Sequence, residues 1–151
     1  MPAYHDDWEI VYTIRDEDNL IVVFYFDVFN GNRYANVRKC IESPTFQGPT
    51  KNGVKFKEEI IIQILSGLEE LRQTDLQDGL ESLEIANIEK NSNTRIIISV
   101  VNDNGHFKID IREYRITNNF TGFTHKGVRL GYEQINELIK GFQLLEEECP
   151  F

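Results

Sequence analysis

Basic and aromatic side chains recur together at two places in the chain, where their types suggest a common chemistry. The nine residues are Arg33, Tyr34, Arg38, Lys55, Lys108, Arg112, Tyr114, Lys126 and Arg129. Lysine and arginine side chains can pair with phosphates, and aromatic rings can stack on unpaired bases. The alternative is that these are the ordinary outward residues of exposed strands, because aromatics favour sheets and lysine protects sheet edges.

Patterns typical of catalysis or metal binding are missing from the sequence. The three histidines, His5, His106 and His125, have no metal-ligand spacing to one another or to Cys40 and Cys149. The chain has no nucleophile elbow, phosphate-binding loop or dinucleotide-binding glycine motif. We therefore predict that the protein is not an enzyme and that it uses no metal or cofactor. With only two cysteines and no secretory signal, free thiols are favoured over a disulfide.

The charge of the chain is unevenly distributed. The 151 residues carry a net charge of -9, which disfavours a protein that simply coats duplex nucleic acid. Residues 30–57 nevertheless have an excess of five positive charges, and residues 104–131 an excess of three. The acidic excess lies in the predicted helices, the linker and the termini, so the basic segments can still form a local binding surface.

The two basic segments belong to an internal repeat with an offset of 74 residues. Between Asn30 and Leu71, 12 of the 42 positions are identical to those 74 residues later, without a gap. The matches include Arg38 with Arg112 and Gly53 with Gly127. Helix amphipathicity alone would not align glycines and an arginine in one register, so we infer a duplication.

Each half has the same predicted elements. Apolar alternation predicts strands at 22–28 and 96–100, at 35–41 and 107–111, and at 53–56 and 127–130, and earlier strands near 9–14 and 83–88. The Asn30-Gly31 and Asn104-Gly105 pairs are typical of hairpin turns. Helical spacing of apolar residues predicts helices at 61–71 and 135–145. The predicted unit is therefore β-β-β-β-α, present twice.

One such unit has a marginal core of its own, because its helix covers only one face of its sheet. We expect an α+β pseudo-dimer in which two curved antiparallel sheets pack through their helices, each leaving one face open. The predicted domain spans residues 1–151, with repeat 1 at about 7–74, a linker at about 73–80 and repeat 2 at about 81–148. Strand parity points Arg38, Lys55, Arg112 and Arg129 outward, beside the similarly placed rings of Tyr25, Tyr34 and Tyr114.

Two stretches of the sequence carry a family resemblance. The strand from Phe107 to Tyr114, the segment Lys126-Gly127-Val128-Arg129-Leu130 and the helix that follows resemble the positive cofactor four family of transcriptional coactivators. In the first half, the strand from Phe24 to Val28, the turn through Arg33 and Tyr34 and the strand to Arg38 look like a repeat of the purine-rich-element-binding (Pur-alpha) family. The resemblance implies paired β-β-β-β-α units that bind single-stranded DNA or RNA on their sheets.

Carried over by position, the resemblance assigns nucleic-acid contacts to Arg33, Tyr34, Arg38, Lys108, Arg112, Lys126 and Arg129. Strand parity adds Lys55 and Tyr114 to this set. It implies binding with little sequence specificity, in transcription regulation or nucleic-acid maintenance. The alternative is a protein-interaction module of the same fold that holds a partner, or a second copy, through its sheet edges or acidic helices. The sequence has no membrane-spanning run and no secretory signal, which predicts a cytoplasmic protein, or a nuclear one in a eukaryote.

Overall fold

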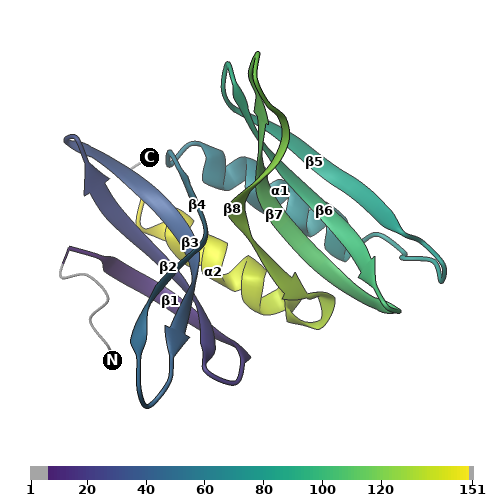
Figure 1. Cartoon of the computed structure of the whole chain (residues 1–151), viewed down its shortest axis with the longest axis horizontal. Helices are drawn as coiled ribbons and strands as arrows, with labels where there is room; N and C mark the ends of the chain where they lie inside the picture. The colour runs from purple at the N-terminus through teal and green to yellow at the C-terminus, as the bar shows by residue number, and fades with distance from the viewer. Residues whose placement is uncertain (1–6, 150–151) are drawn as a thin grey trace.

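The computed structural model describes residues 7–149 and contains two four-stranded antiparallel sheets, each followed along the chain by a helix (Figure 1). The first half consists of β1 (Glu9–Glu17), β2 (Leu20–Phe29), β3 (Asn32–Glu42), β4 (Gln47–Phe56) and α1 (Ile60–Arg72). The second half consists of β5 (Ser82–Asn91), β6 (Thr94–Asp103), β7 (His106–Ile116), β8 (Thr121–Gly131), the short 3-10 helix η1 (Tyr132–Gln134) and α2 (Ile135–Glu147). Strands that follow one another in the chain are paired in each sheet. The predicted α+β fold is confirmed.

The hairpins between β2 and β3 and between β6 and β7 have the same backbone conformation. Asn30 and Gly31 have φ angles of 52° and 78°, and Asn104 and Gly105 have φ angles of 53° and 88°. Two successive residues with positive φ are what a two-residue hairpin turn of the primed type requires, and Asn-Gly is its preferred sequence. The turn sequence therefore fixes the register of each central strand pair.

The central strands alternate between an inner face, which contacts the helices, and an outer face. In β2 the side chains of Val22, Phe24 and Phe26 are buried on the inner face, as the alternation predicts. Ile21, Val23 and Tyr25, which point the other way, form a small second cluster with Cys40 on the outer face. The outer face of the first sheet is therefore only partly open.

The last strand of each sheet is longer than predicted. β4 begins at Gln47 and β8 at Thr121, whereas the sequence pattern suggested starts at 53 and 127. In β4, Cys40 pairs with Pro49 and Arg38 pairs with Gly53. The one residue between Arg38 and Cys40 therefore lies opposite three residues, Thr50 to Asn52, which form a bulge. β8 bulges at residues 124–126 in the same way. The bulge interrupts the side-chain alternation, which is why the alternation revealed only the end of each strand.

The two helices are exchanged between the halves. α1 packs against β5 and β6 of the second sheet, α2 packs against β1 and β2 of the first, and the helices contact each other (Figure 1). Gly67 in α1 lies against Ile98, and Gly141 in α2 lies against the ring of Phe24. One continuous apolar cluster joins the inner faces of both sheets to both helices. Within residues 7–149, no helix is long and apolar enough to cross a lipid bilayer.

Candidate nucleic-acid interface

β4 and β8 lie side by side where the two sheets meet (Figure 1). A hollow of about 460 Å³ is lined by residues of both strands. We call this hollow the basic groove. Its lining comes from both sheets and consists of Arg38, Lys51, Gly53, Lys55, Lys90, Glu113, His125 and Lys126. The bulges of β4 and β8 supply Lys51, His125 and Lys126, so the interrupted strand pairing builds this part of the wall.

Three of the five lysines and arginines in the basic groove have no carboxylate partner within the described part of the chain. Lys55 pairs with Asp27 at 3.0 Å, and Lys90 pairs with Glu113 at 2.7 Å. Among residues 7–149, no acid forms an ion pair with the other three, Arg38, Lys51 and Lys126. Counting the ion pairs as neutral, the groove therefore retains a positive charge that an anionic ligand can neutralise.

Arg38 is held firmly in the wall of the groove. Its Nη1 donates to the carbonyl of Thr50 at 2.9 Å, and its Nε donates to the hydroxyl of Tyr25 at 3.1 Å. Its guanidinium lies across Gly53, where any Cβ would collide with it. Because these bonds occupy only part of the guanidinium's five N–H donors, a fixed and charged donor remains for a phosphate.

Tyr25 does not provide the exposed ring that its outward position suggested. Its ring is 2% exposed and is covered by Trp8, with the ring centroids 3.7 Å apart and the planes 11° from parallel. Burial raises the pKa of the Tyr25 hydroxyl to about 12, although the hydrogen bond from Arg38 opposes this shift. Tyr25 therefore serves as a buried support for Arg38.

In the second sheet, Arg112 and Arg129 lie on the outer face as predicted but share one carboxylate. Asp110, which is 4% exposed, accepts from Arg112 at 3.0 Å and from Arg129 at 3.4 Å. Arg112 also donates to the carbonyl of Thr124 at 3.0 Å, as Arg38 does to Thr50. The equivalent arginines thus have the same backbone anchor but different electrostatic surroundings.

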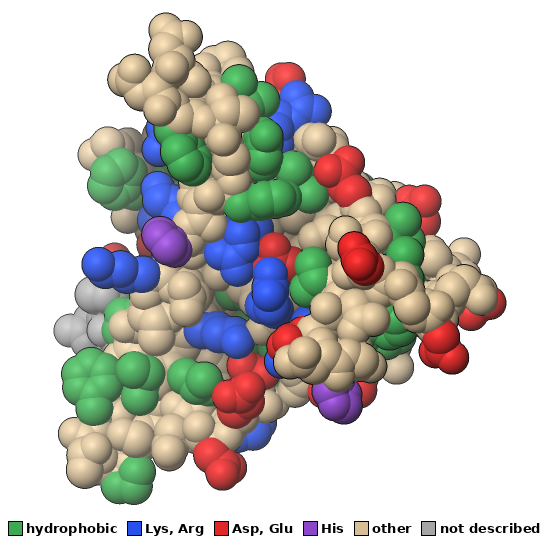
Figure 2. Space-filling view, turned by 45° about the vertical axis from the view of Figure 1, so that its right-hand side comes forward, with side chains coloured by type: hydrophobic (Ala, Val, Ile, Leu, Met, Phe, Trp, Pro, Cys, Tyr) green, Lys and Arg blue, Asp and Glu red, His purple; other side chains and the backbone are tan. Residues whose placement is uncertain are grey.

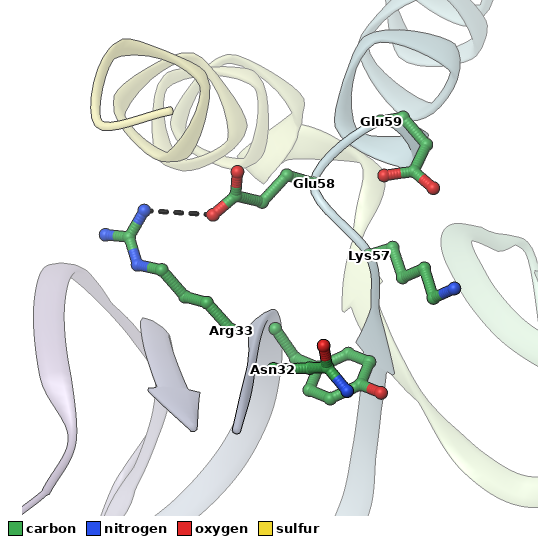
Figure 3. A pocket seen from close by; sticks show the side chains of 6 residues that line it. Asn32, Arg33, Lys57, Glu58 and Glu59 are labelled. Atoms are coloured by element: carbon green, nitrogen blue, oxygen red, sulfur yellow. Dashed lines mark hydrogen bonds and ion pairs between the residues drawn. The ribbon is translucent and has the colours of Figure 1, made fainter. Parts of the chain in front are cut away.

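Arg33 and Tyr34 lie outside the basic groove. Arg33 points to the helix side of the first sheet, where its guanidinium pairs with Glu58 at 2.9 Å (Figure 3). The guanidinium also covers the ring of Phe26 and pairs with Glu9 at 2.9 Å. The half-buried ring of Tyr34 has the ammonium of Lys55 5.6 Å from its centroid. Arg33 therefore joins β1, β3 and the start of α1, and its charge is already paired.

Lys108 and Tyr114 also lie outside the basic groove. Lys108 lines a separate hollow rich in carboxylates and pairs with Asp103 at 3.8 Å. The half-buried Tyr114 meets the ring of Phe123 edge-on, with centroids 5.1 Å apart. Of the nine predicted site residues, the structure therefore brings Arg38, Lys55 and Lys126 together in the groove.

Several exposed groups escaped the sequence interpretation. Lys51 and His125 line the groove from equivalent positions of the two repeats. Their equivalence in the repeat was the one feature of the sequence that could have pointed to them, because they lie in bulges outside any regular strand pattern. Among the described residues, the exposed Phe, Tyr and Trp rings are all phenylalanines, namely Phe29, Phe46, Phe120 and Phe123. Phe46 and Phe120 are identical residues of the repeat, but buried phenylalanines are so common that their exposure could not be inferred.

On the surface of the protein, charged side chains lie next to apolar ones. On the face in Figure 2, Lys and Arg side chains gather in a central band with hydrophobic patches above and below. Most Asp and Glu side chains on this face lie toward its right and lower edges. A net acidic protein thus has a face on which cations and apolar groups are neighbours.

Comparison with known proteins gives a likeness among solved structures. No protein-family model matches the chain, and the comparison with curated proteins also gives no match. Among solved structures, the chain is similar to the crystal structure of a PC4 homolog from Burkholderia pseudomallei. The sequences are 24% identical, the match covers 50% of this chain and 100% of the homolog, and the TM-score is 0.42.

Proposed function

We propose that the protein binds single-stranded DNA or RNA in the basic groove, with little dependence on sequence. The observation that carries the proposal is the grouping of Arg38, Lys51 and Lys126 in one hollow, where no carboxylate of residues 7–149 pairs with them. Cations that track a backbone give affinity without sequence preference, since phosphates are the same at every nucleotide. The sequence resemblance to the positive cofactor four and Pur-alpha families supports the same function.

The shape of the lining favours a single strand over a duplex. The walls come from strands and their bulges, and within residues 7–149 neither helix contributes to the groove. Aromatic rings are exposed nearby, and bases can stack on them only when they are unpaired. A duplex would present only its phosphates to this surface.

The test is the salt dependence of binding to a labelled single-stranded oligonucleotide. If Arg38, Lys51 and Lys126 each neutralise one phosphate and release the cation condensed on it, log affinity should fall against log salt with a slope of about -2. The double variant Lys51→Gln with Lys126→Gln should weaken binding and make this slope shallower by about 1.4.

Lys140 provides the matched control, because it is an exposed lysine of α2 with no acidic partner among residues 7–149. Lys140→Gln changes the net charge by one without touching the groove, so it should leave the affinity and the slope as they are. Binding that ignores salt, or that responds equally to Lys140→Gln, would contradict the proposal. Such a result would favour the protein-interaction module.

A further inference from the structure

A second hollow of about 550 Å³ continues from the basic groove along β8, and two phenylalanine rings dominate it. Its lining is Arg115, Thr117, Phe120, Phe123, Thr124 and His125. Phe120 is 50% exposed and Phe123 is 52% exposed. His125 lines both hollows, so the two are neighbours on the surface.

The two rings are held in place before any ligand arrives. The backbone of Phe120 is fixed by Thr117, whose Oγ1 donates to the Phe120 carbonyl at 2.7 Å and accepts from its N–H at 2.9 Å. The ring of Phe120 lies over Gly122, and the ring of Phe123 rests against the edge of Tyr114. A ligand that stacks on these rings therefore has little side-chain freedom to remove, which favours affinity.

The chemistry of this hollow matches an unpaired base attached to a phosphate backbone. The phenylalanine faces can stack on any base, and no acid among residues 7–149 pairs with the exposed Arg115. Phe123 and Lys126 are three residues apart on β8, a span of at most about 10 Å. A strand with a phosphate at Lys126 would thus bring a neighbouring nucleotide to the rings.

We propose that Phe120 and Phe123 form a base-stacking site at the β8 end of the basic groove, with an unpaired nucleobase as its ligand. This inference rests on the proposed function, because the groove positions the strand. It also makes the two halves of the protein unequal. In repeat 1 the positions of Arg115, Phe123 and His125 are occupied by Ile41, Pro49 and Lys51.

Repeat 1 supplies the matched control residue. Phe46 is 57% exposed at the equivalent hairpin tip, and its backbone is fixed by Ser43 as that of Phe120 is by Thr117. Phe46 lacks the second ring, the arginine and the histidine of the proposed site. Phe46→Ala therefore removes an equally exposed ring without removing the site.

The experiment compares two labelled single strands of the same length, an oligothymidylate and an oligomer of abasic sugars that keeps the phosphates but has no bases. Phe120→Ala should weaken binding of the oligothymidylate by roughly 5- to 140-fold, the loss expected for one stacked base. Binding of the abasic strand should not change. Phe46→Ala should change neither affinity. Phe120→Tyr should preserve binding, whereas Phe120→Leu, which keeps apolar bulk without a π-face, should not.

Thermal melts show whether each variant is folded, and the exposure of Phe120 predicts that all of them are. If the wild-type protein binds both strands with the expected salt dependence but Phe120→Ala and Phe123→Ala bind like wild type, the stacking site is wrong and the proposed function survives. If the wild-type protein binds neither strand, both proposals fail.

Discussion

At the scale of single residues, the main question is whether Arg38 and Arg112 act alike. Both occupy the same repeat position, and both donate to a bulge carbonyl. Asp110 accepts from Arg112, whereas the neutral Asn36 stands at the equivalent position beside Arg38. Because Asp110 already neutralises Arg112, a phosphate gains less from pairing with Arg112 than with Arg38.

We therefore predict that Arg38→Gln weakens binding of a single strand more than Arg112→Gln does. The salt slope should become shallower by about 0.7 for Arg38→Gln and by less for Arg112→Gln. Asp110→Asn places in the second half the residue that the first half has at Asn36, so it should raise the affinity for a single strand. In that background, Arg112→Gln should weaken binding more than it does in the wild-type protein. Equal losses for the two arginine variants would contradict this assignment.

A second residue-scale prediction concerns alkaline stability. Burial raises the pKa of the Cys40 thiol from 9.0 to about 12 and that of the Tyr25 hydroxyl from 10.0 to about 12. Both groups ionise more readily in the unfolded chain, so their contribution to stability is complete below pH 9 and is lost as the pH rises toward 12. The free energy of unfolding should fall by roughly 1 kcal/mol or more between pH 8 and pH 10.5.

Urea denaturation at the two pH values measures this change. Cys40→Ala removes one of the two groups and should reduce the loss of stability on raising the pH. A free energy of unfolding that stays constant to pH 10.5 would show that the thiol and the hydroxyl are not shielded from solvent as the structure indicates.

At the scale of elements, the sequence was informative where side chains follow a regular period. The Asn-Gly turns, the inner faces of β2 and β6 and both helices could be predicted because turn preference and periodicity are local properties. The bulges at Thr50 to Asn52 and at residues 124–126 could not, since the two extra residues in each bulge leave the ladder and interrupt the alternation. The sequence therefore predicted only part of the lining of the basic groove, because much of that lining lies in the bulges.

Paired contacts were a second limit on prediction. Asp16 pairs with Lys39 at 2.8 Å, and the equivalent positions hold Lys90 and Glu113, which pair at 2.7 Å with the charges exchanged. Compared one position at a time, the two repeats have opposite charges here, although both repeats keep an ion pair between the same two positions. The paired state of a lysine thus depends on a partner from another strand, which sequence spacing does not reveal.

Gly67 and Gly141 test the exchanged packing of the helices. A Cβ at Gly141 would overlap the buried ring of Phe24, whereas a Cβ at Gly67 would lie 3.0 Å from the Ile98 Cδ1 atom and 3.1 Å from the Ala86 Cβ atom. Alanine stabilises a helix by about 1 kcal/mol relative to glycine. This gain can offset the close contacts at Gly67 but not the overlap with the Phe24 ring at Gly141.

Gly141→Ala should therefore lower the free energy of unfolding by about 1–3 kcal/mol. Gly67→Ala should stay within about 1 kcal/mol of wild type. Chemical denaturation of the two variants beside wild type measures both values. Similar stabilities for the two variants would mean that α2 does not lie against Phe24 as closely as described.

At the scale of the whole molecule, exchange of the helices makes each half depend on the other. Each sheet is covered by the helix of the other half, and one apolar cluster contains residues of both repeats. The division into repeat 1, linker and repeat 2 within one pseudo-dimeric domain stays a prediction, and the separated halves can test it. The binding groove has the same dependence, because its lining comes from β3 and β4 together with β5, β7 and β8.

Residues 1–74 expressed alone should form a dimer or remain unfolded. Without α2, the inner face of the first sheet would expose Phe24 and its neighbours, and the simplest cover is α1 of a second copy. A folded dimer has a melting temperature that rises with protein concentration. Sedimentation and melts at several concentrations measure this, and a monomer with a cooperative, concentration-independent melt would contradict the exchange.

Gly67 makes the fragment experiment decisive. In the full chain Gly67 lies against Ile98 and Ala86, but in a dimer of repeat 1 it would take the place of Gly141 and lie against Phe24. Gly67→Ala should therefore be nearly neutral in the full chain yet should destabilise the fragment dimer by about 1–3 kcal/mol, because the added Cβ would then meet an immobile ring. If the substitution has the same small effect in both, α1 covers something other than the inner face of the first sheet in the fragment.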